Sequence, residues 1–234
     1  MNMDETAVVE KILTDLFPLN RSLTGTGVQK SLEYIQKHIV KGSQIKSIAS
    51  GTEVFDWKIP PEWNVREAYV KNKFGKKIID IAVNNIHLMS YSDSVYTTLS
   101  KDELIKRLHT LPDHPSWIPY RTSYYAKNWA FCCRHDLLES EDFVGPFEVK
   151  IDSEFDKEGN LVWLEGYKKG RLEDEILISS YCCHPSLAND NLSGFVAAAL
   201  LFKFLQSTDT KFSYRLVILP ETIGAIAFLS QADV

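Results

Sequence analysis

The fold is decided by residues 175–224, which read EILISSYCCHPSLANDNLSGFVAAALLFKFLQSTDTKFSYRLVILPETIG. Residues 175–183 are largely apolar, as in a strand that is buried on both faces. Residues 192–205 are apolar almost all round, as in a buried helix, and residues 214–219 form a second apolar run. Strand, helix and strand at this spacing predict a βαβ unit with a right-handed crossover. We therefore expect an α/β fold with a mainly parallel or mixed sheet flanked by helices.

The chain before this segment has two other patterns. Residues 4–17 and 24–40 carry apolar side chains at helical spacing, which predicts two amphipathic helices. From residue 45 short β-type runs alternate with turn signals. These patterns divide the chain into residues 1–50 with the N-terminal helices of the core, residues 51–140 as an inserted, mainly β domain, and residues 141–234 with the core βαβ unit.

Composition restricts the class of protein. With 234 residues, 44% of them hydrophobic, the chain is long enough to bury a core, and its net charge of -5 gives no overall attraction to nucleic acid or an anionic membrane. Its first ten residues carry acidic side chains rather than a basic region, and it contains no apolar run near the ~18 residues of a spanning helix. We therefore expect a cytoplasmic protein that binds neither nucleic acid nor membrane. Its four cysteines form two adjacent pairs, which favours reduced, buried thiols.

Three side chains that can carry chemistry follow the predicted strands. His184 and Asp190 come after the first strand of the βαβ unit, and Glu221 comes after the second. The carboxyl ends of parallel strands meet at one edge of a sheet, where ligands bind. Imidazole and carboxylate ligands, with one further carboxylate to take a proton, suit a metal-bound hydrolytic water. Each residue also has an ordinary explanation, such as a helix cap at Asp190, but their convergence favours a functional site.

These residues resemble a known family. The segment HPSLANDNLSG (184–194), followed by PETIG (220–224), looks like the core of zinc-dependent aminopeptidases of the M28 type. More closely, the chain resembles the aminopeptidase-like proteins known as DUF4910 and DUF2172, through FDWKIPPEW (55–63), PYRTSYY (119–125) and the Cys-Cys-His-Pro stretch. The resemblance implies that His184 and Asp190 bind zinc and that Glu221 is the general base of amide hydrolysis. Gly194 would let the helix start lie close to the strand that carries the site.

The sequence departs from this family in three respects. Dinuclear relatives have a second glutamate where this chain has Thr222, so the resemblance implies one zinc ion. Ser186 stands where relatives have an aspartate that orients the first histidine ligand. Relatives also supply further ligands, and an additional domain, beyond the position of Val234. We therefore expect the chain to be truncated at its C-terminus, with an exposed sheet edge that invites association into a homo-oligomer.

Two further segments offer candidate contacts with a ligand. In the inserted domain, Arg121, Tyr124 and Tyr125 form a cluster able to bind the terminal groups of a substrate, although the aromatic rings could equally pack the core of that domain. In the turn after the first helix, Arg21 and Ser22 are expected in a solvated loop.

Three functions compete. The first is a zinc-dependent aminopeptidase-like hydrolase that acts on a small peptide or another amide-containing substrate. The second is a catalytically silent metal-binding or assembly module, linked through some relatives to polysaccharide biosynthesis. The third is thiol catalysis by Cys183 beside His184, which is disfavoured because adjacent residues on a strand point to opposite faces.

Overall fold

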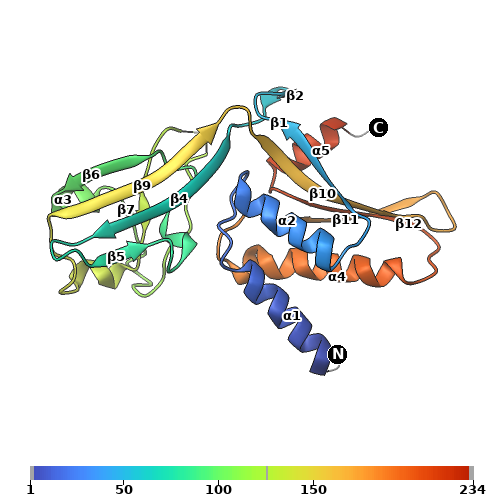
Figure 1. The fold of residues 1–234 in the computed structure, drawn as a ribbon, viewed down its shortest axis with the longest axis horizontal. Coiled ribbons are helices and arrows are strands. Elements are labelled where there is room, and N and C mark those ends of the chain that lie inside the picture. The colour runs from blue at the N-terminus through green and yellow to red at the C-terminus, as the bar shows by residue number, and fades with distance from the viewer. Residues whose placement is uncertain (1–2, 125, 232–234) are drawn as a thin grey trace. The chain divides into compact units, whose positions relative to one another are not determined.

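The computed structural model describes residues 3–124 and 126–231, which divide into two units (Figure 1). Unit 1 is formed by Met1–Glu62 and Asp156–Val234, and unit 2 by Trp63–Phe155. These limits differ from the boundaries expected after residues 50 and 140. The division falls instead at the ends of two ten-residue strands, β4 (Glu62–Lys71) and β9 (Phe147–Asp156), because both strands belong to the sheet of unit 2.

Unit 1 contains a mixed four-stranded sheet in the order β1-β10-β12-β11. Its strands are β1 (Gln44–Ala49), β10 (Asn160–Lys168), β11 (Glu175–Tyr181) and β12 (Ser213–Leu219). The only parallel pair described within it is β11 with β12, and β10 runs antiparallel to both of its neighbours. The other elements of unit 1 are α1 (Met3–Leu16), α2 (Thr26–His38), β2 (Glu53–Val54), β3 (Trp57–Lys58), the short η3 turn (Ala188–Leu192), α4 (Ser193–Gln206) and α5 (Ile223–Gln231).

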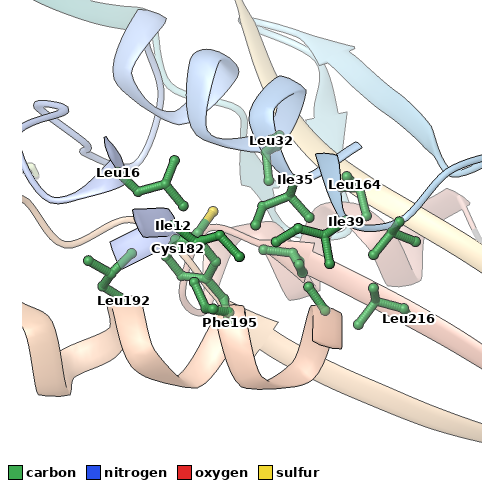
Figure 2. Close-up of a cluster of buried hydrophobic side chains, with 14 of the residues drawn as sticks. Ile12, Leu16, Leu32, Ile35, Ile39, Leu164, Cys182, Leu192, Phe195 and Leu216 are labelled. Carbon is green, nitrogen blue, oxygen red and sulfur yellow. The ribbon is translucent and has the colours of Figure 1, made fainter. Parts of the chain in front are cut away.

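The core of unit 1 lies between one face of this sheet and helices α1, α2 and α4 (Figures 1 and 2). Figure 2 shows apolar side chains from all three helices meeting those of β10 and β12. The predicted helical spacing explains this burial, since one face of α2 supplies Val28, Leu32 and Ile35 to the core. Ile39 joins them directly after the helix ends. The predicted α/β class, with its βαβ unit and its two N-terminal helices, is therefore observed.

Helix α5 contacts the sheet at β10. Because side chains alternate along a strand, Trp163 and Glu165 of β10 face away from the core that Leu164 helps to form. Phe228 of α5 lines a hollow together with these two residues, so α5 lies on the opposite face from α4. Strand β11 was expected to be buried on both faces, but within the described residues it lies at one edge of the sheet and leaves Leu177 52% exposed.

Unit 2 is built around a second four-stranded sheet, in the order β5-β4-β9-β6. Its remaining elements are short, so this part of the chain is mainly β, as its turn-rich sequence predicts. Beyond β4 and β9 they are β5 (Lys77–Asp80), η1 (Asn85–His87), β6 (Val95–Leu99), α3 (Lys101–Ile105), β7 (Leu108–His109), β8 (Phe131–Cys132) and η2 (His135–Glu139). Neither unit has, in its described part, a helix with the length and apolar character needed to cross a membrane.

Candidate metal centre

The candidate site lies where the two parallel strands of unit 1 end. Tyr181 of β11 is paired in register with Leu219 of β12, and the Cys182 N–H donates to the Leu219 carbonyl at 3.0 Å. The chain segments that follow both strands therefore leave the sheet at the same edge. Here Nε2 of His184 lies 3.7 Å from Oε2 of Glu221, although the two residues are far apart in sequence.

A third donor, Cys183, joins these two side chains. One donor atom from each of Cys183, His184 and Glu221 lies within 4.8 Å of the others. The His184 side chain is buried, whereas that of Glu221 is 51% exposed. The site is thus anchored on the protein side and open to solvent at its carboxylate.

The expectation that Cys183 and His184 point to opposite faces is wrong. The Cys183 Sγ lies 3.7 Å from Nδ1 of His184, because β11 ends at Tyr181 and strand geometry no longer applies two residues later. The sulfur also accepts the Glu221 backbone N–H at 3.2 Å. Burial raises the pKa of the Cys183 thiol to about 12, so it remains protonated at neutral pH and is a poor nucleophile.

Asp190 lies outside the three-donor group that the described residues form, but it is connected to it. The Tyr181 hydroxyl donates to Oδ1 of Asp190 at 2.5 Å, and the Tyr181 ring centroid lies 5.4 Å from that of His184. This hydrogen bond raises the pKa of Tyr181 to about 12, so the hydroxyl keeps its proton and acts as the donor. The residue at the N-cap of α4 is Leu192, so Asp190 does not have the ordinary capping role that was considered for it.

The residue after Asp190 fixes this turn to the sheet. Nδ2 of Asn191 donates to the Ser180 Oγ and to the Tyr181 carbonyl, both at 3.1 Å. A Cβ atom placed on Gly194 would lie 1.8 Å from Oδ1 of Asn191. The missing side chain of Gly194 thus leaves room for the Asn191 amide, whereas the sequence predicted room for close approach of the helix to the strand.

Arg21 and Ser22 are buried, with 0% and 2% exposure, so the expectation of a solvated loop is wrong. Nε of Arg21 donates to the His184 carbonyl at 3.2 Å, and Nη1 donates to the carbonyl of Leu16 at the end of α1. Burial lowers the pKa of Arg21 to about 10, which still leaves it charged at neutral pH. Within the described part of the chain, Nη2 has no hydrogen-bond partner. Arg21 therefore ties the site loop to α1.

The predicted substrate-binding cluster belongs to unit 2. Tyr124 packs edge-on against Tyr91 at 5.6 Å between ring centroids, and Tyr91 stacks on Trp63 at the same distance. This contact agrees with the alternative in which the aromatic residues pack the inserted domain. Arg121 is exposed, and Tyr125 lies outside the described residues. Their role toward a substrate stays a prediction.

The chemistry of the donors fits zinc. Zinc binds imidazole nitrogen and carboxylate oxygen in proteins. His184 and Glu221 bring one group of each kind to the same edge of the sheet, 3.7 Å apart. The Cys183 sulfur is the less suitable donor, because it would first have to lose its proton and give up the hydrogen bond from Glu221.

Comparisons with known proteins identify relatives of the whole chain. The model of a domain of unknown function, DUF4910, matches residues 10–233. A protein of Clostridium acetobutylicum, whose name refers to polysaccharide biosynthesis and to an aminopeptidase-like domain, is 46% identical over 228 residues. The match covers 96% of this chain and 51% of the relative. The chain thus spans about half the length of the curated relative that it matches.

Solved structures show the same fold. A crystal structure from Clostridium acetobutylicum, described as that of a peptidase, matches with a TM-score of 0.93 at 44% identity, over 98% of this chain and 54% of the other. A zinc aminopeptidase from Bacillus subtilis matches with a TM-score of 0.51 at 10% identity, over 95% of this chain and 64% of the other. At 10% identity the second match concerns the fold alone. Together they confirm the predicted aminopeptidase-like α/β fold.

Proposed function

The chain belongs to the DUF4910 family and has a peptidase-like fold, and from this premise we propose that it forms the metal-binding part of a hydrolase that cleaves amide or peptide bonds. In this proposal His184 and Asp190 hold a single zinc ion and Glu221 is the general base. The observation that carries it is the 3.7 Å approach of His184 and Glu221 where the parallel strands end.

Each residue has an environment suited to its proposed task. His184 is buried and its backbone carbonyl accepts a hydrogen bond from Arg21, so the segment that carries the ring is held to the protein. Glu221 is half exposed, so its carboxylate can reach water and substrate. A zinc ion at this site would supply a Lewis acid for the scissile carbonyl and would lower the pKa of a bound water toward ~7.

Proton transfer is assigned to Glu221. Its carboxylate takes a proton from the attacking water and gives it to the nitrogen of the leaving amine, so that one water is consumed and one carboxylate and one amine are formed. The carboxylate of Glu221 is unprotonated again at the end of the reaction. Thr222, a poor ligand for zinc, follows Glu221 in the sequence, which favours one ion over two.

The proposed substrate is a peptide amino terminus or an amide in an acylated sugar conjugate. The first follows from the fold shared with a zinc aminopeptidase, and the second from the name of the Clostridium acetobutylicum relative. Arg121 and Tyr124 remain candidates for contact with the terminal groups of such a substrate.

Zinc content and amide hydrolysis, measured on a set of variants, test the proposal. We expect H184A and D190A each to weaken zinc binding by more than tenfold, with H38A as the control for loss of an imidazole outside the site. E221Q should retain zinc and lose hydrolysis of aminoacyl amides by about 10²–10⁴-fold. Wild-type zinc binding in both H184A and D190A would refute the ligand assignment, and wild-type turnover in E221Q would remove Glu221 as the base.

A further inference from the structure

The Tyr181 side chain contacts both residues that we assign to the ion. It is the last residue of β11, directly before the segment that carries Cys183 and His184. Its hydroxyl donates to Oδ1 of Asp190 at 2.5 Å. Its ring lies 5.4 Å from the His184 ring, centroid to centroid, with an angle of 59° between the ring planes.

We propose that Tyr181 is a positioning residue that sets the orientation of the Asp190 carboxylate for metal binding. This inference rests on the proposed function, because it assumes that Asp190 is a ligand. A carboxylate rotates freely about its last side-chain bond unless one oxygen is fixed. A hydroxyl donor on Oδ1 fixes the group and leaves Oδ2 as the oxygen available to a cation. Hydrogen-bond partners of metal ligands act in this way in many metal sites.

The backbone around Asp190 supports this assignment. Asp190 and Asn191 have non-helical backbone angles inside η3. The Asn191 side-chain amide donates to the carbonyl of Tyr181, so the residue that follows Asp190 is tied to the end of β11. The Tyr181 hydroxyl adds the side-chain part of the same attachment. The Asp190 carboxylate and the residue after it are thus both attached to the end of β11.

A structural role in the core does not account for the hydroxyl. Tyr181 is only partly buried and is not a member of the buried cluster between the sheet and the helices. The next residue, Cys182, does belong to that cluster. Removal of the Tyr181 hydroxyl therefore takes nothing from the packing of unit 1, and its effect should concern Asp190.

The test is Y181F, which removes one oxygen atom and keeps the ring beside His184. Zinc affinity is measured by competition with a chelating dye, and the melting temperature is measured without metal. We expect zinc affinity to fall by about 10–100-fold with the metal-free melting temperature unchanged. The visible spectrum of the Co²⁺ form should also change, because it reports the coordination geometry.

The chain offers a matched control in Tyr34. Its hydroxyl donates to Oδ2 of Asp15 at 2.7 Å, so Y34F removes the same kind of hydrogen bond from the pair of helices α1 and α2. Zinc affinity should be unchanged in Y34F. A loss as large as that in Y181F would show that the effect is not specific to the site, and would overturn the inference.

A double-mutant cycle separates this inference from the proposed function. If Tyr181 acts through Asp190, Y181F should have no further effect on zinc affinity in a D190A background. If D190A weakens zinc binding and Y181F does not, the positioning role is refuted and the proposed function stands. If D190A leaves zinc binding unchanged, Asp190 is not a ligand and both statements fail. An equal effect of Y181F in both backgrounds refutes the action through Asp190.

Discussion

Replacement of Gly194 by alanine should destabilise unit 1 although it lies in a helix, where alanine is normally favoured. The new Cβ would lie 1.8 Å from Oδ1 and 2.7 Å from Cγ of Asn191. Because both distances are far below van der Waals contact, the amide must move. Its two hydrogen bonds to β11, each 3.1 Å long, would then be lost.

The expected magnitude follows from these contacts. Two hydrogen bonds contribute about 2 kcal/mol, and an amide left partly buried without partners costs about 1–2 kcal/mol more. The gain in helix propensity from glycine to alanine offsets at most about 1 kcal/mol. We therefore expect the free energy of unfolding of G194A to fall by about 2–3 kcal/mol.

Urea titrations with and without the Asn191 side chain measure this effect. In an N191A background the amide is absent, so the G194A change should no longer destabilise and should raise the free energy of unfolding by up to about 1 kcal/mol. The reversal of sign is the decisive result. If G194A has the same effect in both backgrounds, or no effect in the wild type, the assignment of the space above Gly194 to the Asn191 amide is refuted.

Arg21 and His87 give two further predictions. R21K should lower the free energy of unfolding by about 2–3 kcal/mol in urea titrations. The reason is that an ammonium cannot reach the carbonyls of both Leu16 and His184 as the guanidinium does. An unchanged unfolding midpoint would contradict the observed bonds. Burial lowers the pKa of His87 below 6.5, so below that pH the unfolded state binds more protons. The free energy of unfolding should therefore fall as the pH drops from 8 to 5, and it should fall less steeply in H87Q. Equal pH dependence of the free energy of unfolding in the wild type and H87Q would contradict the prediction.

The parts of the site that were predictable are those fixed by topology. The apolar runs at residues 175–183 and 214–219 predicted two parallel strands, and parallel strands bring the segments that follow them to one edge. The approach of His184 to Glu221 was therefore predictable from the sequence, because each residue follows one of these strands. The burial of β11 could not be predicted in the same way, because exposure of an edge depends on which strands pair with it and not on its own composition.

The supporting contacts could not be read from the sequence for a different reason. Arg21 lies in a turn rich in polar and small residues, and no local pattern distinguishes it from a solvated arginine. Its burial arises from a bond to a carbonyl 163 positions away. The Tyr181–Asp190 bond spans nine positions but depends on the irregular backbone inside η3, which no periodicity encodes.

The bond from Arg21 to the His184 carbonyl also orders events during synthesis. The arginine leaves the ribosome 163 residues before its acceptor, which at about 5–20 residues per second is a delay on the order of 10–30 s. Throughout this interval its guanidinium must stay hydrated, and the chain cannot close around it. Capture of a cation by the finished loop would therefore require that the segment around Arg21 and the much later segment around His184 have already joined.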